Sequence, residues 1–117
     1  MTVKECYEQM GSNYNNVLER LGSESLVKRF ALKFKDDPSF ANLTNALEAG
    51  DAPEAFRAAH TLKGICLNLG FDKLYEASAA LTELLRGKDT VQGYEELYKE
   101  LQNQYEITLA AVAGMQE

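Results

Sequence analysis

The sequence lacks several features that define whole classes of protein. It has two cysteines, Cys6 and Cys66, two prolines, one histidine and no tryptophan in 117 residues. Two cysteines at no metal-ligand spacing exclude a cysteine-based metal site and favour a reduced, cytoplasmic setting. No apolar run approaches the ~20 residues that span a bilayer, and residues 1–20 lack the layout of a signal peptide. We therefore expect a cytoplasmic protein with no membrane association.

Basic side chains are also scarce. Twelve Lys and Arg stand against eighteen Asp and Glu, which gives a net charge of −6. Because phosphate contacts need a basic surface, so acidic a chain is a poor candidate for binding nucleic acid or an anionic membrane. Hydrophobic residues make up 45% of the chain and charged residues 26%. These values and the length favour one folded domain over a disordered chain.

Helical periodicity runs through almost the whole chain, and no segment shows the alternation typical of a strand. A capping box at Thr2 and Glu5 predicts the first of two short helices within residues 1–22. Asp37, with Pro38 in the first helical position, and Asp51 predict two further helix starts. The longer helices are expected over residues 23–35, 38–49, 51–69 and 72–86, and from residue 89 onward.

The last helix is predicted to start at Asp89 with Gln92 and to carry a coiled-coil-like seam. This seam comprises Val91, Tyr94, Tyr98, Leu101, Tyr105, Thr108 and Val112. Short connections at 50–51, 70–71 and 87–89 favour antiparallel neighbours. The predicted fold is therefore all-α: an antiparallel up-down four-helix bundle over 23–117, with short N-terminal helices over 1–22, in a single domain overall. All aromatic side chains, Phe30 included, are expected to pack in its core.

The single histidine, His60, falls on the shoulder of the helix predicted over 51–69. It lies about 100–120° from the centre of the apolar stripe, so we expect it to be partly exposed. Lys63 and Gly64 follow one turn later on the same side. A glycine inside a helix costs about 1 kcal/mol relative to alanine, which indicates a close approach to the backbone. An exposed imidazole, a nearby cation and a bare patch suit a phosphoryl group brought by a partner.

Plainer interpretations of these residues stay open at this point. A lone histidine on a helix shoulder is usually a surface residue, and a lone glycine sometimes only lets two helices pack closely. One histidine without a second ligand one turn away gives no metal site.

The motif from His60 to Gly64, His-Thr-Leu-Lys-Gly, followed by Asn68-Leu69-Gly70, closely resembles the signature of histidine-containing phosphotransfer (HPt) domains. The resemblance is strongest over residues 38–87 and extends over about 23–112. Two positions depart from the family pattern. Ile65 follows the motif glycine where the family often has Ser or Ala, and Thr82 stands where many members have Gln or Glu near the imidazole. The group that orients His60 is therefore left open, and Glu83 is not an obvious substitute.

The resemblance implies a helical bundle that carries a phosphoryl group on one histidine in a multistep phosphorelay of two-component signal transduction. It implies that His60 is the phosphoacceptor, that Lys63 stabilises the phosphoryl charge and that Gly64 admits the receiver domain of a response regulator. Such domains take the group from an aspartyl phosphate and pass it to another receiver, without an ATP-dependent kinase activity of their own. We expect no cofactor in this chain, because the Mg²⁺ of the transfer belongs to the receiver.

The implied partners are response-regulator receiver domains and a hybrid sensor histidine kinase. The expected contact residues for these partners are Phe56, Arg57, Leu67 and Thr82. Charge distribution agrees, since residues 57–88 hold five basic and three acidic side chains, whereas 89–117 hold one and six. The less acidic region suits docking on the acidic pocket of a receiver.

Three alternatives remain. The chain could be an adaptor that binds a receiver or a kinase without taking phosphate, although His60 and Lys63 argue against it. It could be an enzyme with Cys66 as nucleophile, but Cys66 falls on the apolar stripe and has no visible acid–base partner. It could also be a structural bundle without chemistry, which would leave Gly64 unexplained.

Overall fold

The computed structural model describes residues 1–115 and is all-helical over them, as the sequence predicts. No helix within this range is both long and apolar enough to cross a membrane. Residues 116 and 117, which belong to the predicted 23–117 bundle, lie outside the described residues. The elements are α1 (Val3–Gln9), α2 (Tyr14–Leu21), α3 (Glu24–Lys33), the 3₁₀ turn η1 (Phe34–Asp36), α4 (Ser39–Ala49), α5 (Ala52–Leu69), α6 (Asp72–Leu85) and α7 (Glu95–Gly114).

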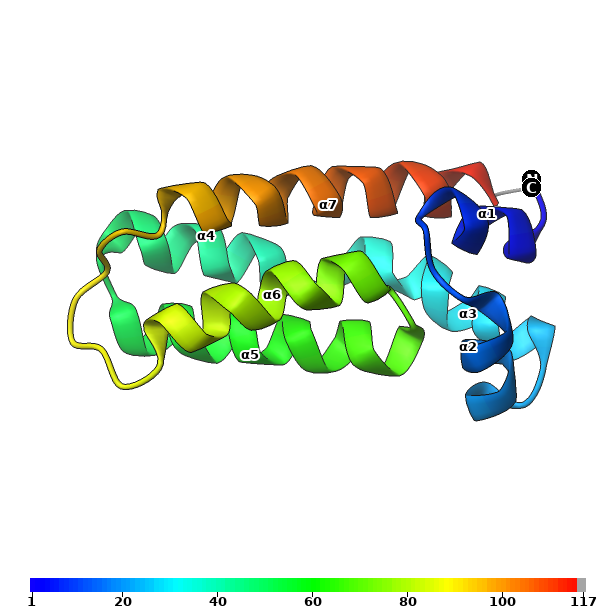
Figure 1. The fold of residues 1–117 in the computed structure, drawn as a ribbon, viewed down its shortest axis with the longest axis horizontal. Coiled ribbons are helices and arrows are strands. Elements are labelled where there is room, and N and C mark those ends of the chain that lie inside the picture. Colours follow the sequence, from blue (N-terminus) through cyan, green and yellow to red (C-terminus); the bar gives the residue numbers. More distant parts are fainter. Residues whose placement is uncertain (116–117) are drawn as a thin grey trace.

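The four longest elements of the C-terminal part run along the 42 Å long axis of the molecule (Figure 1). Helix α5 packs against both α4 and α6, and α6 packs against α7. Aromatic side chains join α4 to α7, because Phe40 stacks on Tyr98 and on Tyr105, with ring centroids 5.8 and 4.0 Å apart. The hydroxyl groups of Thr44 and Tyr98 are 2.7 Å apart and share a hydrogen bond. These helices therefore enclose one hydrophobic core.

Most predicted helix ends are confirmed by their capping geometry. Thr2 and Glu5 form the complete capping box of α1. The Asp51 side chain accepts a hydrogen bond from the Glu54 amide at the start of α5, at 3.1 Å. Helix α4 begins one residue later than predicted, at Ser39, whose amide donates to the Asp37 carboxylate at 2.8 Å. The N-cap is therefore Pro38 rather than the predicted Asp37, although the Asp37 carboxylate still accepts a backbone amide at the start of the helix.

The predicted start of the last helix at Asp89 is wrong. Helix α7 begins at Glu95, and the connection from α6 is a longer irregular loop with turns and bends, over residues 86–94, rather than a short turn. Gly87 and Gly93 both have positive φ, +69° and +66°, so the backbone cannot continue as a helix through this segment. Asp89 and Gln92 have the spacing of a capping box, but the left-handed Gly93 separates them from the helix. Val91 of the predicted seam lies in this connection, whereas Tyr94 is the N-cap of α7 and the remaining members lie on the helix, with Leu101, Thr108 and Val112 buried.

The N-terminal helices cap the turn between α5 and α6. The buried Tyr7 donates its hydroxyl hydrogen bond to the Leu69 carbonyl at 2.6 Å. Arg20 donates to the Leu67 and Asn68 carbonyls at 2.9 and 3.2 Å. The Asp72 amide, at the start of α6, donates to the hydroxyl of Ser12 at 3.1 Å. These bonds satisfy backbone groups that a helix end leaves without partners. The division of the chain into 1–22 and 23–117 stays a prediction.

Replacing Tyr7 by phenylalanine tests this capping. The change leaves the ring packed but removes the donor to the buried Leu69 carbonyl, so we expect a loss of about 1–3 kcal/mol in the free energy of unfolding. Urea denaturation followed by circular dichroism measures it. Tyr14→Phe is the control, because Tyr14 is half-buried beside Tyr7 and its ring lies 5.8 Å away. An equal loss in both variants would show that the Tyr7 hydroxyl contributes nothing specific.

Candidate functional site

The exposed face of α5 carries the only histidine of the chain. His60 is exposed at the middle of this helix. At 100° per residue, Lys63, Gly64 and Leu67 fall within about 60° of it around the helix axis. These four residues form one continuous strip, which we call the His60 strip. Leu67 is 56% exposed, so the strip ends in an apolar side chain that faces water.

The opposite face of α5 is buried against the core. Ala55, Ala59, Leu62 and Cys66 are all fully buried there. This division into a buried and an exposed face fixes the rotation of the helix about its axis. His60 therefore lies on the outer side of α5 because the apolar stripe occupies the inner side.

Gly64 is not required by the packing of α5 against other helices. A Cβ atom built on Gly64 would find no neighbouring heavy atom within 4 Å. By contrast, a Cβ on Gly70 would lie 3.0 Å from the Cβ of Val17. The interpretation of Gly64 as an internal packing residue is thus excluded. Its missing side chain leaves open space on the outer surface, one turn from His60.

His60 contacts an aromatic ring on its own helix. Phe56, one turn earlier, stacks on the imidazole with ring centroids 5.8 Å apart and planes inclined by 11°. The guanidinium carbon of Arg86, which follows α6, lies 5.1 Å from the centroid of the same Phe56 ring. Phe56 thus neighbours both the imidazole on its own helix and a cation at the end of α6.

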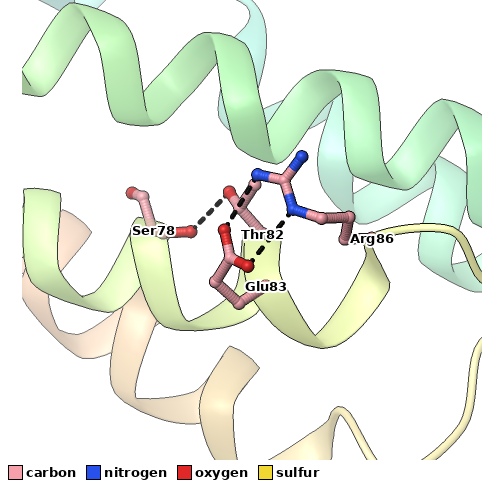
Figure 2. Close-up of polar contacts among 4 residues, drawn as sticks. All are labelled: Ser78, Thr82, Glu83 and Arg86. Atoms are coloured by element: carbon pink, nitrogen blue, oxygen red, sulfur yellow. Dashed lines mark hydrogen bonds and ion pairs between the residues drawn. The ribbon is translucent and has the colours of Figure 1, made fainter.

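Arg86 is held in turn by Glu83. Figure 2 shows the two side chains facing each other, with Arg86 Nε 3.2 Å from Glu83 Oε1 and Nη2 2.8 Å from Oε2. The hydrogen bond from Arg86 lowers the pKa of Glu83, and the nearby charges of Arg86 and Lys63 lower it further. The same pair raises the pKa of Arg86. An ionised carboxylate neutralised by a guanidinium therefore lies beside the His60 strip.

Sequence reasoning did not assign a role to Arg86 and set Glu83 aside. The available signal was their opposite charge at i, i+3 spacing, close to the end of α6. That spacing is common on solvated helices, so only the structure shows that the pair reaches Phe56.

The predicted contact residues have different environments. Arg57 is exposed on α5 and ion-paired with Glu54, and Phe56 is half-buried. Thr82 corrects the prediction, because it is fully buried and its hydroxyl donates to the Ser78 carbonyl at 2.7 Å (Figure 2). A threonine in mid-helix commonly bonds back to the preceding turn in this way. This placement does not support a contact between Thr82 and a partner, nor a bond from Thr82 to His60.

Two hollows lie along α5, and only one of them, of about 450 Å³, is lined by His60. This hollow is bounded by α5 and by the connection that follows α6, with Arg57 and Lys88 among its lining residues. The other, of about 410 Å³, lies near the far end of α5 and is lined by Phe30 and Ile65 but not by His60. Phe30 is 37% exposed there, so the prediction that it packs in the core is wrong.

The cysteines are poorly placed for nucleophilic chemistry. Cys66 is fully buried, and burial raises the pKa of its thiol. Burial also raises the pKa of Cys6 to about 11. Both thiols are therefore neutral near pH 7, where only a thiolate would attack. Within residues 1–115 no group of three His, Cys, Asp or Glu side chains is arranged to hold a metal ion.

Comparison with known proteins gives one match. A search of curated proteins and a search of solved structures each returned none. A family model described as "Hpt domain" matches residues 37–112. The match begins just before α4, ends within α7 and contains the whole His60 strip. Because it covers more than half of the chain, the protein belongs to the Hpt domain family of histidine phosphotransfer domains.

Proposed function

We propose that this protein is a phosphoryl carrier of a multistep phosphorelay. In this proposal His60 takes the phosphoryl group from an aspartyl phosphate on a receiver domain and passes it to the receiver of another response regulator. The observation that carries the proposal is an exposed imidazole next to a glycine whose Cβ position is empty. The alternating chain direction of α4 to α7 in Figure 1 supports an up-down four-helix bundle as its scaffold.

The transfer is a displacement at phosphorus. A lone pair on one ring nitrogen of His60 attacks the phosphorus atom, an N–P bond forms, and the P–O bond to the receiver aspartate breaks. The electron pair leaves with the aspartate carboxylate, and the proton of the imidazole stays on its other nitrogen. Passing the group on reverses these steps with a different aspartate. Because Mg²⁺ and the aspartate belong to the receiver, this chain needs to supply only the imidazole and its surroundings.

Lys63 and Gly64 have complementary roles in this proposal. Lys63 is half-buried one turn from His60 and places an ammonium group where it can neutralise charge on the phosphoryl oxygens. Gly64 leaves the space into which the loops of a receiver can close over His60. Leu67 continues the strip as an apolar contact. Docking would expel water and lower the local dielectric constant, which strengthens the attraction between Lys63 and the phosphoryl group.

Phosphorylation of His60 is tested by transfer from a phosphorylated receiver. The chain should acquire an acid-labile, alkali-stable label, and His60→Gln should abolish it while leaving the thermal melt nearly unchanged. No other side chain of this sequence can form phosphohistidine. A wild-type chain that binds receivers without acquiring the label would instead be the adaptor considered above.

Two substitutions at Gly64 separate access from stability. Gly64→Ala should keep transfer and raise the free energy of unfolding by up to about 1 kcal/mol, because alanine is the better helix former and its methyl group meets open space. Gly64→Gln should also fold, but its longer side chain covers the approach to His60 and should slow transfer. Denaturation and a rapid-quench time course measure the two effects. Normal transfer by Gly64→Gln would remove the access role.

Lys63→Ala should slow transfer more than it weakens receiver binding. An exposed pair contributes only about 0.2–1 kcal/mol before the receiver docks, and more once water is expelled. Rapid-quench kinetics and titration calorimetry measure transfer and binding, with Lys99→Ala on the exposed face of α7 as the control. If Lys63→Ala reduced affinity strongly at an unchanged transfer rate, Lys63 would be a docking residue.

A further inference from the structure

The orientation of the His60 ring is set by a cluster of three residues, Phe56, Glu83 and Arg86. We infer that Phe56 holds the imidazole by stacking and that Arg86, fixed by Glu83, holds Phe56 in place from the adjacent helix. The three are positioning residues, which act on the phosphoryl transfer through His60. The consequence for transfer rests on the proposed function, whereas the geometry of the ring does not.

The contacts of His60 point to this cluster. Within residues 1–115 the imidazole is in ring contact with Phe56 and makes no hydrogen bond. Thr82, on the face of α6 toward the core, is bonded to the Ser78 carbonyl and is buried. The stack with Phe56 is therefore the interaction that selects a ring orientation among those open to an exposed histidine.

Phe56 needs support to act in this way. Phe56 is only half-buried. If its side chain changed rotamer freely, its contact with the imidazole would not hold the ring in one orientation. Arg86 lies over its ring at 5.1 Å, within the range of a cation–π interaction. Two hydrogen bonds to Glu83 orient the guanidinium group, in a pair whose side chains are 53% and 61% exposed. The cluster thus connects the start of the His60 strip on α5 to the end of α6.

Stacking is compatible with the chemistry of the transfer. A side chain that orients imidazole by a hydrogen bond occupies one of its two nitrogens. Contact through the ring face leaves both nitrogens free at the ring edge, one for the phosphorus atom and one for the proton. In addition, Arg86 neutralises the Glu83 carboxylate, whose charge would otherwise repel an incoming phosphoryl group.

The geometry is tested on the free protein by NMR of the His60 ring protons, which are unambiguous because the chain has one histidine. Phe56→Leu should remove the ring-current shift of these protons. Arg86→Gln should move them part of the way in the same direction, and Arg86→Lys should restore part of the difference. Arg57→Gln is the matched control, because Arg57 is an exposed arginine next to Phe56 that pairs with Glu54 instead.

The functional consequence is tested by transfer from a phosphorylated receiver. Arg86→Gln should slow transfer by roughly tenfold, within the ~100-fold that a 1 Å misplacement can cost, at nearly unchanged receiver affinity and thermal melt. Unchanged ring-proton shifts in both Phe56→Leu and Arg86→Gln would overturn the positioning cluster even if the wild-type protein transfers normally. Shifts that change as expected in a protein that accepts no phosphoryl group would leave the cluster in place and refute the proposed function.

Discussion

Burial of one face of α5 is the constraint on which the rest of the structure depends. Ala55, Ala59, Leu62 and Cys66 fill the core side, and their small or compact side chains let α4 and α6 pack closely on either flank. Because a helix has only one rotation that buries this stripe, the residues on the opposite side must face outward. The exposure of His60 and the open space at Gly64 both follow from it.

Much of the fold could be predicted because its signals are local. Capping residues such as Asp51, the glycines that end α4 and α5, and the apolar periodicity all act within one or two turns. The start of α7 could not be predicted in this way, because Asp89 and Gln92 satisfy a local pattern that the left-handed Gly93 overrides. Phe30 illustrates a second difficulty, since an amphipathic stripe indicates which face is apolar but not whether a neighbour covers all of it.

The candidate site likewise has a part that local sequence predicts and a part that depends on packing between helices. His60, Lys63 and Gly64 lie on one helix, so their spacing alone indicates that they share a face. Thr82 and Glu83 are adjacent in sequence but point to opposite environments, one into the core and one to the surface. Which of them faces α5 depends on the rotation of α6, and that is set by tertiary packing. Contacts between different elements, such as that of Arg86 with Phe56, cannot be predicted from the residue pattern of a single helix.

The capping of the α5–α6 turn by α1 and α2 has a consequence for where this domain can be divided. The family model begins at residue 37, yet Tyr7, Ser12 and Arg20 complete the backbone hydrogen bonding of two helices inside the matched region. The limit of sequence similarity therefore leaves out residues that complete the hydrogen bonding of the matched region. A fragment cut at the similarity limit would keep every residue of the motif but would release the carbonyls of Asn68 and Leu69, so that the last turn of α5 would exchange its amide hydrogens more rapidly.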